Sequence, residues 1–174
     1  MVKVWDAFVR IAHWMLVACV AAAWFTRQHL HEWIGYAALA VMALRILWGL
    51  IGSKYARFAG FVRSPGKTFS YARAVMQGAE PRYLGHNPLG GWMIVALLGT
   101  VALVGATGWL ATTDRYWGVE WVEDLHEALA DALLVLVALH VAGVVLTSVR
   151  QRENLPRAMI TGRKAAPRPG DVFE

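Results

Sequence analysis

The chain has 174 residues, of which 57% are hydrophobic and only 17% are charged, and its mean hydropathy is positive. This composition excludes an ordinary soluble domain and predicts an integral membrane protein. The net charge of +5 and the pI near 9.7 require no nucleic-acid partner. The basic residues gather beside the apolar stretches, as the positive-inside rule of membrane proteins predicts.

Four apolar stretches are long enough to cross a bilayer, which takes about 20 residues per helix. They cover residues 8–27, 31–52, 89–112 and 122–149. We predict an all-α, integral membrane four-helix bundle that forms one domain over residues 1–152, followed by a basic tail over residues 153–174. The first stretch has no small-residue cleavage site and is too long for a signal core, so we expect it to remain as a helix.

Lys and Arg residues concentrate before the first stretch, between the second and third, and after the fourth. The positive-inside rule therefore places both termini and the middle loop in the cytoplasm. The middle loop mixes basic and aromatic residues, and we expect a membrane-surface loop rather than a dedicated docking site. The tail is polar, basic and contains proline, so we expect it to be loosely ordered.

The first stretch carries His13 about one turn inside its cytoplasmic end. Taken alone, this histidine is more simply explained as a hydrogen-bonded interfacial residue than as a ligand. The single cysteine, Cys19, lies in the middle of the same stretch. It excludes disulfides, a thiolate metal cluster and a CxxCH attachment site, so any haem would be bound non-covalently.

The second stretch begins near two histidines, His29 and His31, of which only one can face the bundle, because positions two apart on a helix point about 200° apart. We choose His31, since Gly35 follows one turn later and leaves room for a flat macrocycle. Arg45 follows His31 by nearly four turns and faces the same side, roughly 21 Å nearer the cytoplasm. A guanidinium at this depth needs an anion such as a haem propionate; snorkelling to the headgroups is the alternative.

Before the third stretch, His86 lies in GHNPLGG among turn-forming residues. We expect a structured turn there, and a role near a propionate or in quinone protonation is the weaker alternative. The third stretch has no histidine and no charge. Its glycines predict close packing against a helix or a flat cofactor, and they are Gly99, Gly105 and Gly108.

The fourth stretch carries His126 and His140, which share one face and lie roughly 21 Å apart along the helix. Imidazole inside a membrane helix is costly and usually serves a function in the bundle interior. Matching depths pairs His140 with His13 inside and His126 with His31 outside. Zinc or copper would need three or four ligands at one level, so we predict two non-covalent haem b groups, each with two axial histidines.

Two axial imidazoles leave no open position on iron, so the predicted chemistry is electron transfer rather than activation of O2. Arg45 or Arg10 would tune the potentials of the two haems. The outer loop is acidic, which is either a solvated rim or a surface for a basic periplasmic electron carrier. Its carboxylates are Asp114, Glu120, Glu123, Asp124 and Glu127.

The segments VWDAFVRIAHW, HEWIGY, RILWGLIGSKYARF, GHNPLGG, LHEALAD and ALHVAGV resemble the bacterial cytochrome b561 family over nearly the whole chain up to about Arg152. The first of them, with WGLIGSKYARF, is also similar to the b-type cytochrome subunits of nickel-iron hydrogenases. Those subunits normally have a fifth helix, which argues against a hydrogenase partner. In the family, helices 1, 2 and 4 supply the haem ligands, and the matching positions are His13, His31, His126 and His140.

The resemblance implies a protein of the bacterial inner membrane that exchanges electrons between a membrane quinone and a periplasmic redox partner such as a c-type cytochrome. One alternative is a superoxide:ubiquinone oxidoreductase, which would need a positively charged path to the outer haem, whereas the outer side offers only Arg27 and Arg115. The other is a haem-free membrane scaffold subunit, which would be colourless. We expect membrane lipid around the bundle, and the sequence leaves open whether two copies form a homodimer. The cytoplasmic loop and the surface near His31 are both candidate quinone sites.

Overall fold

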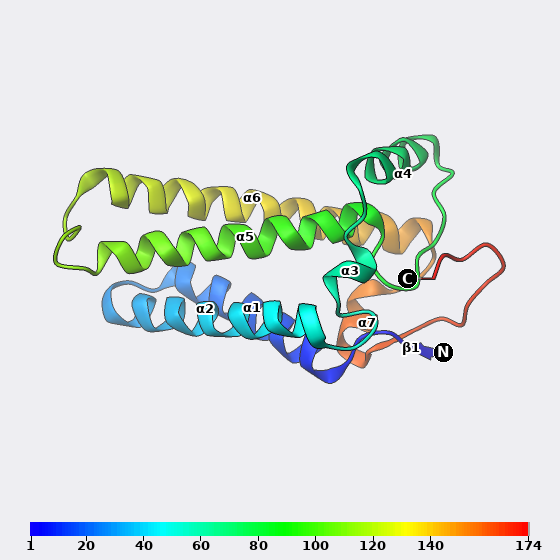
Figure 1. Ribbon diagram of the computed structural model, residues 1–174, viewed down its shortest axis with the longest axis horizontal. Helices are drawn as coiled ribbons and strands as arrows, with labels where there is room; N and C mark the ends of the chain where they lie inside the picture. The colour runs from blue at the N-terminus through cyan, green and yellow to red at the C-terminus, as the bar shows by residue number, and fades with distance from the viewer. Residues whose placement is uncertain (174) are drawn as a thin grey trace.

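The structure, a computed structural model, describes residues 1–173, and four long helices dominate it (Figure 1). Each of the four is long and apolar enough to span a membrane. The four predicted spans are therefore confirmed, with ends that differ by a few residues. The helices are α1 (Ala7–Phe25), α2 (Gln28–Ile51), α5 (Pro88–Ala111) and α6 (Glu120–Arg150).

The helix starts follow from their capping residues. The Asp6 carboxylate accepts a hydrogen bond from the backbone N–H of Val9 at 2.8 Å and so caps α1. The Asn87 side chain does the same for Gly90 at the start of α5, and Pro88 occupies the first turn, where no N–H is needed. Only residues 26–27 separate α1 from α2, so these two helices form a tight antiparallel hairpin.

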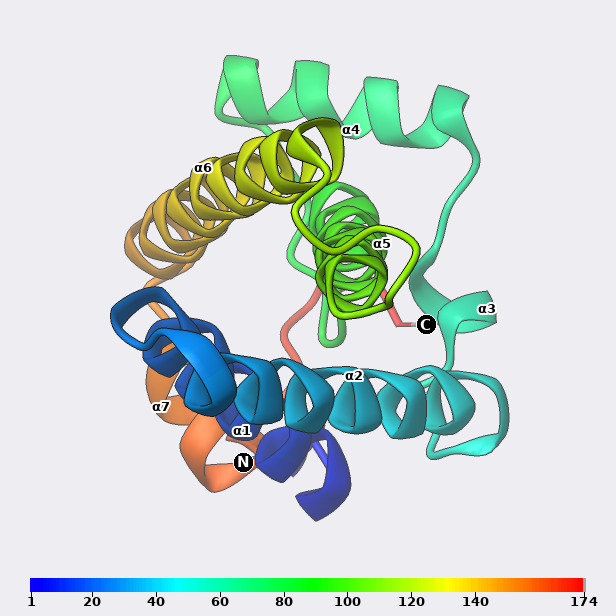
Figure 2. The ribbon, with the colours of Figure 1, turned by 90° about the vertical axis from the view of Figure 1, so that its left-hand side faces the viewer.

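The bundle consists of two helix pairs, α1 on α2 and α5 on α6, joined by the packing of α2 on α5 (Figures 1 and 2). Met42, Val101 and Leu133 form the buried core between them. A Cβ atom added to Gly105 would lie 2.3 Å from the side chain of Leu39 on α2. The predicted close packing of the third span is therefore confirmed at Gly105.

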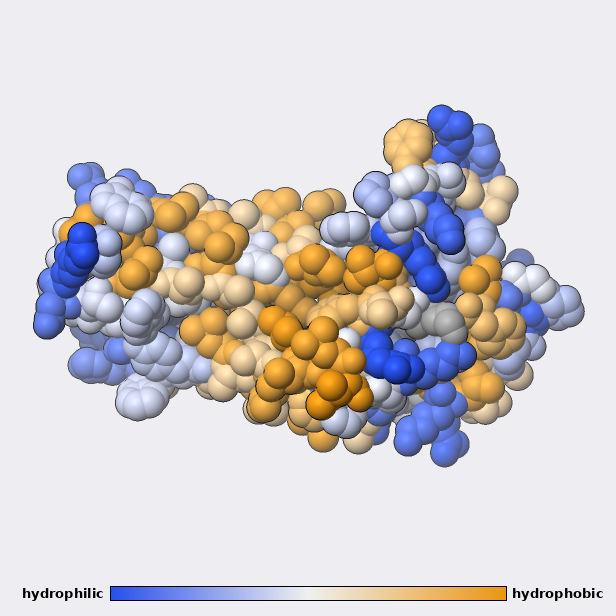
Figure 3. All heavy atoms as spheres, in the orientation of Figure 1, coloured by the Kyte–Doolittle hydropathy of each residue, from blue (hydrophilic) through white to orange (hydrophobic). Residues whose placement is uncertain are grey.

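Hydrophobic side chains cover the middle of the bundle, and hydrophilic ones gather at its two ends (Figure 3). Large apolar residues are exposed along this belt, among them Leu44, Leu103 and Val145. Such a surface is stable only in contact with lipid tails, which supports the membrane assignment. We call the end that carries both termini the inner end, and the opposite one the outer end.

A layer of short elements covers the inner end (Figure 1). It contains α4, a surface helix that the sequence analysis treated as a loop. Pro65 stands in the first turn of α4, and Gly78 ends it with a φ of 67°, a conformation that favours glycine. The elements are β1 (Val2–Lys3), α3 (Phe58–Phe61), α4 (Pro65–Gln77), α7 (Leu155–Thr161) and β2 (Arg163–Lys164).

The expectation of a loosely ordered tail is wrong for the described part of the tail. The tail forms α7, and its strand β2 pairs with β1 in an antiparallel ladder. Glu153 is buried and accepts hydrogen bonds from Arg82, whose guanidinium also binds Asp171. A buried arginine between two carboxylates holds the tail against the segment before α5, because each of these charges would be costly to bury alone.

Candidate cofactor-binding site

The first pair of facing histidines lies toward the inner end of the bundle. His13 projects from the second turn of α1, and His140 projects from the inner half of α6. Their ring centroids are 6.5 Å apart, and the ring planes make an angle of 51°. The structure thus brings together the two residues that the sequence analysis paired by depth.

The second pair lies toward the outer end. His31 in the first turn of α2 faces His126 of α6, with ring centroids 6.0 Å apart and an interplanar angle of 77°. The side chain of His29 is 94% exposed and lies beside Glu32. His31 rather than His29 therefore faces the bundle. Only one of the two was expected to do so, because positions two apart on a helix point about 200° apart.

Backbone carbonyl groups orient both rings of the outer pair. Nδ1 of His31 lies 2.8 Å from the carbonyl oxygen of Ala23. Nδ1 of His126 lies 3.0 Å from that of Val104 and 3.1 Å from Oγ1 of Thr107. A carbonyl oxygen can only accept, so each Nδ1 carries the hydrogen, and Nε2 keeps the lone pair that a metal needs. The sequence analysis missed these groups, because a backbone acceptor has no residue signature.

The ring separations fit two imidazoles on opposite sides of one metal ion. With a metal–nitrogen bond of about 2.0 Å and a ring centre about 1.1 Å behind the nitrogen, the two centroids would be about 6.2 Å apart. The observed distances of 6.5 and 6.0 Å lie on either side of this value. The separation of the two rings in each pair is therefore close to the one that a shared metal ion would require.

Glycines adjoin the histidines on α2, α5 and α6. An added Cβ atom at Gly35, one turn after His31, or at Gly143, three residues after His140, would meet no atom within 4 Å. At Gly108 it would lie only 3.0 Å from Cε1 of His126. Gly108 thus allows the ring of His126 to lie against α5, while the space beside Gly35 suits a flat macrocycle.

Arg45 is a buried cation with an unused donor. Its side chain belongs to α2, the residue is 6% exposed, and its guanidinium lies 5.4 Å from the ring centroid of Phe58. Its buried Nη1 has no hydrogen-bond partner among residues 1–173. A buried N–H without an acceptor is costly, so this group fits the predicted contact with a haem propionate.

Asp6, the cap of α1, is the acidic group whose charge interacts with Arg45. Burial alone would raise the pKa of Asp6, but hydrogen bonds from Ser53, Trp48 and Val9 and the charge of Arg45 hold it below its ordinary value. The distance from Trp48 Nε1 to the Asp6 carboxylate is 3.0 Å. Asp6 therefore stays ionised and ties the start of α1 to the end of α2.

Arg10 uses its guanidinium to bind the tail. It donates hydrogen bonds to the carbonyl oxygens of Ile160 in α7 and of Asp6. These contacts join α7 to α1. That Arg10 lies near a haem remains a prediction. In the structure its guanidinium links α7 to the start of α1.

His86 lies at the inner end, buried between the rings of Trp5 and Phe61, whose centroids are 4.4 and 4.6 Å from its own. Burial first, and then the positive charges of Lys164 and Arg45, lower the pKa of His86. The packing agrees with the expected structured turn before α5. Sequence reasoning missed Trp5 and Phe61 as neighbours, because they come from distant parts of the chain.

The family described as prokaryotic cytochrome b561 matches residues 4–162, which is most of the chain. The matched span includes all four long helices and both pairs of facing histidines. No curated protein and no solved structure matches the chain.

Proposed function

Because the chain belongs to the prokaryotic cytochrome b561 family, we propose that it is a transmembrane di-haem cytochrome b that exchanges electrons between a membrane quinone and a periplasmic redox partner. Membership makes it a membrane b-type cytochrome of electron transfer with b-type haem as its cofactor. Bound haem supplies a reversible one-electron iron couple. The number of haems, their ligands and the two redox partners are our proposal.

The observation that carries the proposal is the presence of two facing histidine pairs at two depths. His13 with His140 would hold one iron, and His31 with His126 would hold the other, with ring separations that suit a shared metal. Each pair would fill both axial positions, which leaves none for O2 and favours electron transfer. The spacing of His126 and His140 corresponds to roughly 21 Å along α6 and places one pair toward each end of the bundle.

Arg45 would bind a propionate of the inner haem, because its buried Nη1 has no other acceptor among the described residues. The apolar helices, together with the lipid around them, would exclude water from both pairs. Low polarity around the rings and hydrogen bonds from Nδ1 to carbonyl groups are the means by which this chain would tune the iron potentials. The basic inner end would face the cytoplasm of a bacterial cell, and the outer end the periplasm.

The charge of the outer end supports a basic protein partner such as a c-type cytochrome. The first turn of α6 contributes Glu120 and Glu123, and Arg115 is held over the ring of Tyr116. Such an acidic surface speeds the approach of a cation and slows that of an anion. It therefore does not favour superoxide as the electron donor.

The decisive experiment is a count of haem per chain. We expect the dithionite-reduced minus oxidised spectrum and the pyridine haemochrome of the detergent-purified protein to give two b haems, falling to one in His13→Ala and to one in His31→Ala. His29→Ala is the matched control and keeps two. One haem or none in the unaltered protein would rule out the di-haem arrangement.

The two partners are tested separately. Reduced protein mixed with a ubiquinone or menaquinone analogue is expected to reoxidise, and a failure with both would remove the quinone from the proposal. A basic c-type cytochrome should exchange electrons with the protein at a rate that falls as salt is added. An acidic c-type cytochrome is the control, and equal rates for both would remove the charge argument.

A further inference from the structure

The segment over residues 53–79 is basic and contains no acidic residue. It includes α4, which runs across the inner end of the bundle, roughly at right angles to the long helices (Figures 1 and 2). A helix in this orientation lies along a membrane surface rather than through it. Its cations are Lys54, Arg57, Arg63, Lys67 and Arg73.

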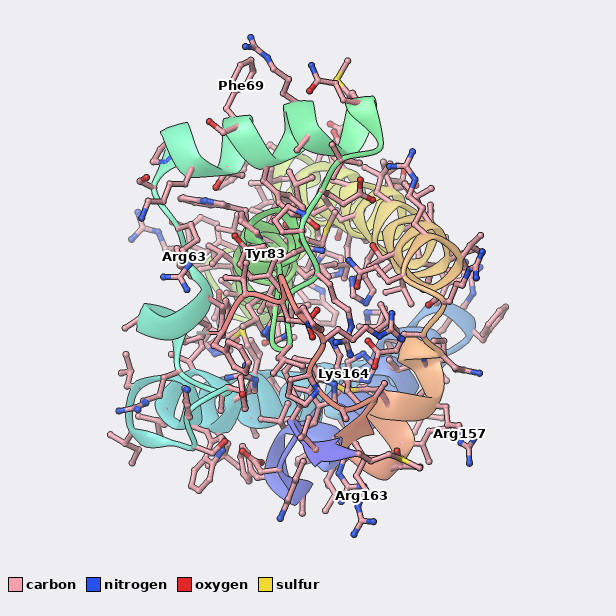
Figure 4. The ribbon with its side chains drawn as sticks, turned by 90° about the vertical axis from the view of Figure 1, so that its right-hand side faces the viewer. Arg63, Phe69, Tyr83, Arg157, Arg163 and Lys164 are labelled. Atoms are coloured by element: carbon pink, nitrogen blue, oxygen red, sulfur yellow. The ribbon has the colours of Figure 1, made fainter. Side chains whose placement is uncertain are left out.

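A cavity of about 600 Å³ opens beneath α4. Arg63 and Tyr83 flank it on the bundle side, where Figure 4 shows both side chains between α4 and the helices below. Its lining contains two cations and three hydroxyl groups that can donate hydrogen bonds. The polar part of the lining comprises Arg63, Lys67, Ser70, Tyr71 and Tyr83.

Within the part of the chain that the structure describes, the cations around this cavity have no anionic partner of their own. Among residues 1–173, no carboxylate lies within ion-pair distance of Arg63, Lys67 or Arg73. The nearby Glu80 is already paired with Arg150, at 3.2 Å. The charge around the cavity is therefore positive and uncompensated.

Tyr71 adds a neutral hydroxyl to the cavity. It is buried in α4, and burial first, followed by Glu80 and Tyr83, raises the pKa of Tyr71 to about 12. The hydroxyl therefore stays protonated at every physiological pH. It can donate a hydrogen bond to an anionic oxygen beside the two cations.

A tryptophan near one end of a membrane helix lies beside the cavity. Trp92, the fifth residue of α5, donates a hydrogen bond from Nε1 to the carbonyl oxygen of Arg63 at 3.0 Å. Exposed tryptophans at the ends of membrane helices mark the interface between lipid and water, and Trp92 is 40% exposed. If Trp92 lies at this interface, its hydrogen bond would hold Arg63 near the depth of the phospholipid phosphates.

Two large apolar side chains are exposed on α4. Phe69 and Met76 are 68% and 86% exposed, and Phe69 points away from the bundle (Figure 4). Arg73 lies over the ring of Phe69, 5.5 Å from its centroid. Apolar residues on one face with flanking cations are the signature of a helix seated in an anionic leaflet.

We propose that α4 and the cavity beneath it form a binding site for an anionic phospholipid, whose phosphate contacts Arg63 and Lys67 while Phe69 and Met76 enter the acyl region. The proposal rests on the inner end facing the cytoplasmic leaflet, which is part of the proposed function. It requires neither haem nor quinone. By binding an anionic lipid, the site would hold the inner end of the bundle at a fixed depth in the membrane.

The test is lipid retention, measured by native mass spectrometry of the detergent-purified protein titrated with phosphatidylglycerol or phosphatidylcholine. We expect at least a fivefold preference for phosphatidylglycerol, and a loss of about fivefold per cation removed in the double variant Arg63→Gln/Lys67→Gln. The control Arg157→Gln/Arg163→Gln removes the same charge from exposed positions outside the cavity (Figure 4) and should keep the preference.

A second measurement needs no substitution. Amide hydrogen exchange in nanodiscs should be slower over residues 65–77 with phosphatidylglycerol than with phosphatidylcholine, and unchanged over α7. Equal retention of both lipids, equal exchange in both discs, or an equal loss in the control variant would each overturn the proposal. So would displacement of the lipid by millimolar inorganic phosphate, which would indicate a site for a soluble anion. A haem count that disproved the di-haem arrangement would leave these results unaffected.

Discussion

Nδ1 of His126 lies 3.0 Å from the carbonyl oxygen of Val104 on the neighbouring helix α5, so one helix supplies the ring and the next one orients it. Gly108 allows this approach, because any side chain at that position would press against the ring. The geometry of the outer histidine pair therefore depends on a residue that would touch no cofactor.

Gly108→Ala should weaken haem binding at the outer pair. The added Cβ atom would lie 3.0 Å from Cε1 of His126 and would force the ring to shift by a few tenths of an ångström. Overpacking of this kind costs about 1–3 kcal/mol, so the haem content measured after extended dialysis should fall from two toward one. Gly99→Ala is the control, because its Cβ atom would meet nothing within 4 Å. Equal haem content in both variants would contradict the prediction.

Arg45→Met should separate the stability of the protein from its affinity for haem. In the haem-free protein, the change removes a buried cation with an unused donor, so thermal stability should not fall. In the loaded protein, it removes a charge-assisted hydrogen bond worth about 1.5–3 kcal/mol, so haem should transfer to an apo-globin at least tenfold faster. Arg57→Met changes an exposed arginine and is the control. A fall in stability without faster haem loss would assign Arg45 a purely structural role.

The docking of the tail should fail in acid. Burial raises the pKa of Glu153, but hydrogen bonds from Arg82 and from the N–H of Ala165 lower it below its ordinary value of 4.5. The ionised carboxylate therefore stabilises the folded state fully above pH 4.5, the ordinary pKa. This stabilisation is lost as the pH falls through the lower pKa that Glu153 has in the folded protein. Proteolysis of the tail should therefore be slow at neutral pH and accelerate only after the pH has fallen below 4.5.

Arg82→Gln is the matching substitution for the same contact. It leaves the buried Glu153 without its ion pair, a change that costs about 3–5 kcal/mol, so the tail should be cleaved rapidly even at pH 7. Arg152→Gln, at an exposed neighbouring position, should behave like the unaltered protein. A tail that is equally protected in both variants would show that the β1–β2 ladder holds it alone.

Asp6→Ala should lower the thermal stability of the inner end. The carboxylate caps α1 and accepts hydrogen bonds from Trp48 and Ser53, so its loss removes a cap worth about 1 kcal/mol and leaves two donors unsatisfied. We expect the melting temperature, followed by circular dichroism, to fall by several degrees. Asp131→Ala, at an exposed position on α6, should change it little. Equal melting temperatures for the two variants would contradict this account.

The histidine pairs could be predicted from the sequence because a membrane-spanning helix determines both the depth and the direction of each side chain. The length of each apolar stretch sets the depth of every residue, and the period of 3.6 sets its direction. His13 therefore had one partner at its depth, His140, and His31 had His126. The same reasoning placed Arg45 near the inner pair, where the structure shows it buried.

The inner layer could not be predicted, because its contacts join residues that are far apart in the chain. Arg82 binds Glu153 and Asp171 across more than 70 positions, and β1 pairs with a strand near the other terminus. Composition alone made the tail look disordered. The helix α4 did leave a signal, since Pro65 and Gly78 mark its two ends, but its basic and aromatic residues led to the interpretation as a loop.

The two-residue link between α1 and α2 bears on how the molecule is made. A hairpin so tight can enter the membrane as one unit during synthesis, long before α6 leaves the ribosome. It then carries His13 and His31, one half of each pair, while the other halves are still untranslated. If each pair binds a haem as proposed, haem acquisition is expected late in biogenesis, and the two irons would link the first hairpin covalently to the last helix through their histidine ligands.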